Sequence, residues 1–235
     1  PRDLAPVPPA SEAEAGIDWS LPSSGNGTRE KTAAQIVKDH SAVARYWRVS
    51  MAVPHSSYDE STQTFHERVC RLRKLAPAYD ADVDRWMRLL GGKSAEKLLD
   101  WVATVTDLSR VTCGVYLDAR RDCGKTMFAN GIARLWGEMP TEIESLIGNF
   151  NSAILDSPVI LADEEIPKGL TSGAIRKIIG STTRPLRRKN IPETGIHGAV
   201  RVILAANNDR LLEFDGEDFS AEDINAMAGR ILYIK

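Results

Sequence analysis

The sequence predicts an α/β fold in which a parallel sheet lies between helices, preceded by a small helical domain. Three short apolar runs support this prediction, and each ends in polar residues: VTCGVYLD (111–118), SPVILADEE (157–165) and AVRVILAANN (199–208). Stretches with helical character separate the runs, which is typical of buried parallel strands joined by helical crossovers. We therefore place an α/β domain at residues 108–235.

The composition is that of an ordinary globular protein. Apolar residues make up 43% of the chain and charged residues 26%. Its length of 235 residues is enough for one sizeable domain and a smaller one. No apolar run approaches the roughly 18 residues of a membrane-spanning helix, so we expect a cytoplasmic protein without a membrane partner. Three cysteines without a CxxC pair favour a reducing compartment and no structural zinc, and the absence of HExxH argues against a metalloprotease. A first residue other than Met favours a fragment of a longer protein.

The region before the α/β domain divides in two. Residues 1–27, rich in Pro, Ala, Ser and Gly, are predicted as a flexible linker or arm because they bury little surface. Residues 28–107 are predicted as a small helical domain, with its tryptophans as core anchors rather than base-stacking platforms. Four apolar stripes at helical spacing support it: Ile36, His40, Val43 and Trp47; Phe65, Val69 and Leu72; Val83, Trp86, Met87 and Leu90; Leu98, Trp101, Val102 and Val105.

A candidate phosphate loop, ARRDCGKT, follows the first apolar run and precedes a predicted helix. In such a loop the backbone N–H groups face the phosphates. Gly124 lets the backbone approach the β-phosphate, Lys125 brings charge to the β- and γ-phosphates, and Thr126 offers a hydroxyl to magnesium. The residues predicted to bind nucleotide are Ala119, Arg120, Arg121, Asp122, Cys123, Gly124, Lys125 and Thr126. The alternative is a chance GKT at the start of a helix.

The loop is irregular because it carries charged residues where glycines are usual. Ala119 replaces the first glycine with a residue that is nearly as small. Arg120, Arg121 and Asp122 are bulky, but a loop that binds phosphate through its backbone leaves side chains free to point outward. The two arginines then add charge near the nucleotide or a neighbouring subunit.

Polar residues also end the other two apolar runs. Asp163 is predicted to hold magnesium through water, and Glu164 to orient or deprotonate the attacking water, with Glu165 as a competitor for that role. Asn207 is placed to hydrogen-bond the γ-phosphate or the water. The alternatives are an ordinary loop start after Ala162 and a turn or helix cap at Asn207.

A basic segment lies between the acidic pair and the asparagine. Residues 168–201 hold eight Lys and Arg against Glu193 alone, whereas 209–223 is acidic. The stretch RPLRRKNIPETGIHGAVRV is predicted as a β-hairpin. Near its tip we expect Arg187, Arg188, Lys189 and His197 to contact the phosphate backbone of a nucleic acid. The alternatives are a solvated hairpin or a subunit contact.

The order of these motifs resembles that of superfamily-3 helicases, the AAA+ ATPases of DNA viruses, phages, plasmids and mobile islands. LLDWVATVTDLSRVTCGVYLDARRDCGKT and RKNIPETGIHGAVRVILAANN are similar to the helicase part of phage and poxvirus-type primase–helicases. The resemblance covers residues 95–235, and it implies that the helical region at residues 28–107 corresponds to the oligomerisation or lid part that precedes the core. It implies an AAA+ P-loop NTPase core that assembles into a homo-hexameric ring, hydrolyses ATP with Mg²⁺ between subunits, and moves along single-stranded or forked DNA. It also implies association with a primase domain or replication proteins.

The resemblance also assigns roles to residues. Lys125 and Thr126 would bind nucleotide, while Asp163 and Glu164 would act at the metal and the water. Asn207 would be the sensor of the γ-phosphate. Lys189 and His197 would belong to the hairpin that grips DNA in the pore. Arg230, with Arg210 as the alternative, would reach the ATP of the neighbouring subunit; otherwise Arg230 is a surface charge beside an edge strand.

The function predicted from the sequence is therefore that of an ATP-dependent DNA helicase or translocase for the replication of a phage, virus or mobile element. Two alternatives stay open. One is another AAA+ ATPase, such as a loader or a packaging motor, which would lack a hairpin between the acidic pair and Asn207. The other is a DNA-binding P-loop scaffold with weak or no hydrolysis.

Overall fold

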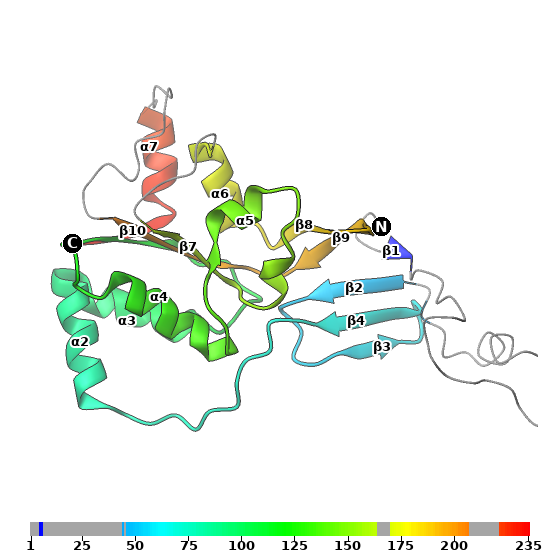
Figure 1. Cartoon of the computed structure of the whole chain (residues 1–235), viewed down its shortest axis with the longest axis horizontal. Coiled ribbons are helices and arrows are strands. Elements are labelled where there is room, and N and C mark those ends of the chain that lie inside the picture. The colour runs from blue at the N-terminus through cyan, green and yellow to red at the C-terminus, as the bar shows by residue number, and fades with distance from the viewer. Residues whose placement is uncertain (1–4, 7–43, 45, 164–169, 207–220) are drawn as a thin grey trace, which may run out of the picture.

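A computed structural model describes residues 5–6, 44, 46–163, 170–206 and 221–235, which form two β-sheets and the helices around them (Figure 1). The helices are α2 (Ala81–Gly91), α3 (Ala95–Thr104), α4 (Lys125–Ala133), α5 (Ile143–Ile147), α6 (Ser172–Gly180) and α7 (Ala221–Ala228), with short 3-10 turns at Gly92–Ser94, Arg134–Trp136 and Ser152–Leu155. No helix of this part of the chain is long and apolar enough to cross a membrane.

The first sheet is parallel throughout, as the sequence predicts. Its strands are β5 (Gly114–Asp118), β6 (Thr141–Glu142), β7 (Val159–Asp163), β10 (Arg201–Ala206) and β11 (Ile231–Ile234). They lie in the order β11-β5-β10-β7-β6, and every neighbouring pair is parallel. The strand that precedes the candidate phosphate loop is thus separated by β10 from the strand that ends in Asp163.

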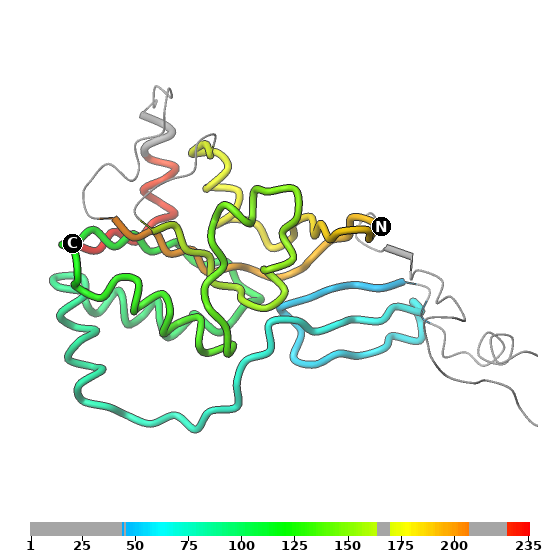
Figure 2. Tube along the Cα trace, viewed as in Figure 1, coloured from blue at the N-terminus to red at the C-terminus, as the bar shows by residue number. Residues whose placement is uncertain are grey.

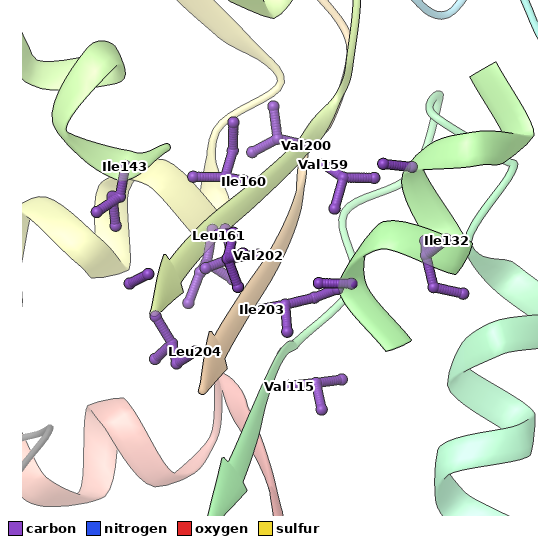
Figure 3. Close-up of a cluster of buried hydrophobic side chains, with 14 of the residues drawn as sticks. Val115, Ile132, Ile143, Val159, Ile160, Leu161, Val200, Val202, Ile203 and Leu204 are labelled. Carbon is purple, nitrogen blue, oxygen red and sulfur yellow. The ribbon is translucent and has the colours of Figure 1, made fainter. Parts of the chain in front are cut away.

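Helices cover both faces of this parallel sheet. Figure 1 shows α3 and α4 on one face and α6 and α7 on the other. Figure 3 shows how side chains from three strands and α4 fill the space between the layers, among them Val115, Ile132, Val159 and Ile203. Every residue of β10 is buried, as expected for a central strand covered on both sides.

The second sheet joins segments that are far apart in the sequence. Its strands are β1 (Ala5–Pro6), β2 (Tyr46–Ser50), β3 (Ser57–Asp59), β4 (Thr64–Arg68), β8 (Thr183–Arg188) and β9 (Ile191–His197). The order is β3-β4-β2-β9-β8, and β1 also pairs with β2. Figure 2 shows the hairpin β8–β9 (orange) leaving the parallel sheet toward β2 (blue), with which β9 pairs in parallel.

The helical prediction for residues 28–107 is wrong over residues 46–68, which form β2, β3 and β4. Trp47, which ends the first predicted stripe, lies in β2, and Phe65, which begins the second, lies in β4. The two residues are directly paired. In a strand, side chains three residues apart point to opposite faces, so the helical spacing is not realised there. β2 pairs instead with β4 and with β9, which lies far along the chain. The expected helix at residues 28–43 lies outside the described residues, as does most of the predicted arm at 1–27.

The helical prediction holds for α2 and α3. Asp80 caps α2, since its side chain accepts hydrogen bonds from the backbone N–H groups of Asp82 and Val83. α2 ends at Gly91. Trp101 anchors α3: its indole N–H donates to the Cys113 carbonyl at 2.8 Å, and its ring lies 6.1 Å from that of Phe128 in α4.

The predicted hairpin is present, but one of its residues is not at the tip. Lys189 and Asn190 form the turn, and Asn190 adopts the left-handed conformation with φ of 61°. His197 pairs with Thr183 at the opposite end of the hairpin. The expectation that His197 lies near the tip is therefore wrong, because the second strand runs on for seven residues before it ends.

Arg201 is the largest fully buried side chain of the described residues. Its Nε donates to the Val105 carbonyl at 2.9 Å, and its Nη1 donates to the carbonyls of Val200 and Arg110. Its Nη2 donates to the carbonyls of Thr104, the last residue of α3, and of Asp107. Burial lowers the pKa of Arg201 to about 10, so the guanidinium is charged at neutral pH. One side chain thus ties the end of α3 to the start of β10.

We expect Arg201→Met to lower the free energy of unfolding by at least about 3 kcal/mol, because several buried carbonyls lose a charged donor. Urea denaturation measures the change. Arg110→Gln is the matched control: its side chain is 83% exposed, so we expect a change within about 0.5 kcal/mol. Equal effects of the two substitutions would show that the buried hydrogen bonds contribute little.

Candidate nucleotide site

The candidate phosphate loop connects β5 to α4, the context that the sequence predicts. Two residues have positive φ: Asp122 at 60° and Gly124 at 96°. Aspartate is one of the few residues other than glycine that adopts this conformation readily. Asp122 therefore serves at a bend where a glycine is more usual, and the loop closes without the missing glycines.

Lys125 begins α4 and folds back into the loop. The side chain is buried, with 6% of the residue exposed. Its Nζ donates to the carbonyls of Ala119 and Arg120, at 2.7 and 2.9 Å. A buried ammonium group held by backbone dipoles at a helix N-terminus gives a concentrated positive charge for an anion.

Thr126 and Asp163 meet at the carboxyl end of the parallel sheet. The Thr126 hydroxyl donates to Asp163 Oδ2 at 2.9 Å, and both residues are exposed to solvent. These two hard oxygen ligands fit magnesium, which takes one or two protein ligands and completes its shell with water and substrate phosphates. Among the described residues there is no cluster of three or more His, Cys, Asp or Glu side chains for a metal.

The charged residues of the loop lie on its outer side. Arg120, Arg121 and Asp122 are all exposed, which agrees with the expectation that a backbone-binding loop leaves its side chains outside. Ala119 is half-buried, and its N–H donates to the Ala206 carbonyl at the end of β10 at 3.3 Å. This bond holds the start of the loop against the central strand.

Trp86 is a site residue that the sequence does not reveal, since its place in a helical stripe predicts a core anchor. A Cβ added at Gly124 would lie 3.0 Å from Trp86 Nε1 and 3.2 Å from Cζ2. The indole of α2 therefore lies directly against the glycine of the loop. α2 is itself fixed to α3, because Arg88 bonds both Asp84 and Glu96.

Two further acidic residues border the site. Asp118, the last residue of β5, is buried and accepts a hydrogen bond of 2.5 Å from the Tyr233 hydroxyl of β11. Glu142 ends β6, and its pKa is raised by burial first and then by Glu144 and Asp163. Neither stood out in the sequence, although Asp118 follows an apolar run just as Asp163 does.

Arg230 lies at the amino end of the parallel strands, opposite the end at which the loop lies. It directly precedes β11, and its backbone carbonyl accepts a hydrogen bond from the N–H of Gly114 at the start of β5. The loop follows the other end of β5, so Arg230 is not part of the same subunit's phosphate site. Its side chain is exposed. The predicted roles of Glu164, Glu165, Asn207 and Arg210 lie outside the described residues.

The four residues expected to bind DNA occupy different environments. Arg187 Nε is 2.7 Å from Glu193 Oε2, so these side chains form an ion pair. The Arg188 guanidinium stacks over the Trp47 ring, 4.6 Å from its centroid. Lys189 is exposed at the turn. His197 lies at the base of the hairpin, where Nδ1 is 3.2 Å from the Thr183 hydroxyl.

Comparison with known proteins gives one family match. A family described as a family of unknown function (DUF5906) matches residues 117–222, from the end of β5 into α7. No curated protein matches the sequence.

Solved structures show the same fold in another protein. The A form of the apo C-terminal region of NrS-1 covers 78% of this chain and 52% of its own length, with a TM-score of 0.56 and 14% identity. The apo C-terminal region of NrS-1 (305–718) covers 78% and 53%, with a TM-score of 0.54 and 14% identity. This chain thus spans about half the length of those structures.

The parallel sheet and the loop between β5 and α4 define the class of protein: the chain has a P-loop NTPase-like α/β core. The C-terminal region of NrS-1 is one solved structure that shares this fold, at low sequence identity.

We expect Gly124→Ala to destabilise the fold by about 1–2 kcal/mol from the positive φ alone, and further from the contact with Trp86. Gly131→Ala in α4 is the matched control. A Cβ there meets nothing within 4 Å, so we expect a gain of about 0.5–1 kcal/mol. Thermal unfolding of both variants measures the effect, and a stable Gly124→Ala protein would contradict the loop geometry.

We expect Thr126→Ala to weaken magnesium-dependent nucleotide binding about tenfold, because one oxygen ligand and the bond to Asp163 are lost. A magnesium titration with a fluorescent ATP analogue measures it. Thr126→Ser keeps the hydroxyl and should bind like the unsubstituted protein. If the alanine and serine variants behave alike, the hydroxyl is not a ligand.

Proposed function

We propose that this chain is the motor part of an ATP-dependent DNA helicase or translocase that serves the replication of a phage, virus or mobile element. The proposal rests on the resemblance of the motif order to superfamily-3 helicases and on the geometry of the loop. The whole protein's activity and partners are included in the proposal, because this chain spans about half of its structural relatives.

The hydrogen bond between Thr126 and Asp163 is the observation that carries the proposal. The two residues are far apart in the sequence, yet the fold joins the hydroxyl after Lys125 to the carboxylate that ends β7. A nucleotide site needs this convergence of a phosphate-binding lysine with oxygen ligands for magnesium. A chance GKT at a helix start has no reason to meet a strand-end acid.

The proposed cycle assigns one task to each residue. ATP binds with its phosphates against the loop N–H groups and Lys125, while Thr126 and Asp163 hold Mg²⁺ directly or through water. The metal would supply positive charge between the β- and γ-phosphates. Glu164 orients and deprotonates the attacking water, and Asn207 senses the γ-phosphate.

Completion of the site by a neighbouring subunit is part of the proposal. Arg230 lies at the end of the parallel sheet opposite its own loop, where its Nη1 donates to the Ala226 carbonyl at 3.2 Å. In the proposed assembly it reaches the ATP of a neighbouring subunit instead of its own. An arginine supplied in this way stabilises charge on the transferring phosphoryl group and is worth about 10³–10⁵ in rate in comparable enzymes. A homo-hexameric ring gives each subunit such a neighbour, with Arg210 as the alternative donor.

The position of the hairpin supports a translocase over a loader or a packaging motor. β8 and β9 are inserted between β7, which ends in Asp163, and β10, which leads to Asn207. Lys189 is exposed at the turn, where it can contact a DNA backbone. Such contact is independent of sequence and weakens with salt.

We expect ATP hydrolysis that single-stranded DNA stimulates, and Lys125→Ala should lower turnover about 10²-fold or more because a charge on the phosphates is lost. A phosphate-release assay with and without DNA measures both. Arg85→Gln is the control, because Arg85 is exposed and forms an ion pair with Asp82 on the surface of α2.

The outcomes separate the possible functions. DNA-stimulated turnover that depends on Lys125 supports the motor. DNA binding without turnover in the hexameric full-length protein would identify a scaffold instead. Turnover without any response to DNA would indicate another AAA+ ATPase.

A further inference from the structure

The six-stranded sheet has one apolar face and one polar face. On the hairpin, Leu186 and Ile196 are buried on the apolar side, while Pro185 and Arg187 of β8 are exposed on the other. Successive residues of a strand point to opposite faces. In β2 the same alternation separates Val49, which is fully buried, from Arg48.

Pairing of the strands gathers basic residues on the polar face. Arg48 of β2 is directly beside His66 of β4. One step along the sheet, Ser50 of β2 lies between Arg68 of β4 and His197 of β9. Four basic side chains from three strands thus occupy neighbouring positions, although they are spread over residues 48–197.

Among the residues that the structure describes, no carboxylate forms an ion pair with Arg48 or Arg68. Within the described ranges, Arg48 has no ion pair, and the Nε atoms of Arg48 and Arg68 are buried without a hydrogen-bond partner. Arg68 donates through Nη1 to the carbonyl of Pro54. Asp59, at the edge of the sheet, instead accepts hydrogen bonds from Ser61 and Thr62. Buried guanidinium donors without acceptors indicate a site for an anion.

We propose that this polar face, defined by Arg48, His66, Arg68 and His197, binds the phosphate backbone of single-stranded DNA. The proposal rests on the proposed DNA-dependent function and extends its DNA contact from the hairpin tip to the sheet. His197 then has a place in the contact although it is not at the tip.

Two features favour a nucleic acid over a small anion. The face is continuous with the β8–β9 hairpin, because His197 belongs to the same strand that returns from Lys189. Tyr46, 40% exposed, lies on the same face of β2 as Arg48, two residues away. An aromatic ring beside basic side chains on a sheet is the arrangement that stacks bases and holds a backbone in single-strand-binding proteins.

The test is fluorescence anisotropy of a labelled oligo-dT with the full chain over a range of KCl concentrations. We expect Arg48→Gln to weaken binding about five- to tenfold at low salt and to reduce the salt slope by about one, as for loss of one phosphate contact. Arg48→Lys should retain most of the affinity, because it keeps the charge. Arg85→Gln is the control for a lost surface arginine far from the sheet, and urea denaturation verifies that each variant is folded.

Several results would overturn the inference. Arg48→Gln and Arg85→Gln binding alike would show that the face does not contact DNA, while Lys189→Ala weakening binding would keep the hairpin and the proposed function. Equal losses on duplex and single-stranded DNA would overturn the assignment to single strands. If ATP is not hydrolysed but Arg48→Gln still weakens binding, the motor proposal fails and the DNA face stands. If the unsubstituted protein binds no DNA, both fail.

Discussion

The buried guanidinium of Arg201 holds together the parts of the chain that the nucleotide site needs. Its hydrogen bonds join the end of α3 and the segment before β5 to the first residue of β10. β10 separates β5 from β7 and therefore sets the distance between the loop and Asp163. α3 also carries α2, so the same anchor fixes the helix whose Trp86 lies on Gly124. A fully buried guanidinium is costly unless its hydrogen-bond acceptors stay in place, so the connection between α3 and β10 is rigid.

The site follows from the direction of the strands. In a parallel sheet every strand ends at the same edge, and ligands bind in the crevice beyond those ends. β5 delivers the loop and β7 delivers Asp163 to that edge, while the N-terminus of α4 adds Lys125 and Thr126. Lys125 is buried, whereas Thr126 and Asp163 are exposed to solvent. The proposed site thus has a buried charge for phosphate beside solvent-exposed oxygen atoms for hydrated magnesium.

The β8–β9 hairpin connects the two sheets. β8 and β9 belong in sequence to the parallel-sheet region, between β7 and β10, but they pair with β2. Arg188 adds a second tie by stacking on Trp47. Because β9 pairs with β2, a displacement of the hairpin relative to the parallel sheet would also move β2 and its basic face. The proposed DNA contacts are thus connected through the hairpin to the parallel sheet, in which β7 carries Asp163.

The sequence by itself determined the parallel sheet, the loop with Lys125 and Thr126, the strand-end Asp163 and the hairpin, because each depends on local patterns: apolar runs, a GKT at a helix start, turn residues. It also predicted α2 and α3. Tertiary structure decided the rest. Residues 46–68 form strands because β2 pairs with β4 and with the distant β9, and β4 also pairs with β3, and no local spacing reveals these partners. Trp86 reached Gly124, and His197 joined Arg48 and Arg68, through packing and register between distant segments. Such contacts depend on where whole elements lie, and a pattern of residues along one element cannot encode that.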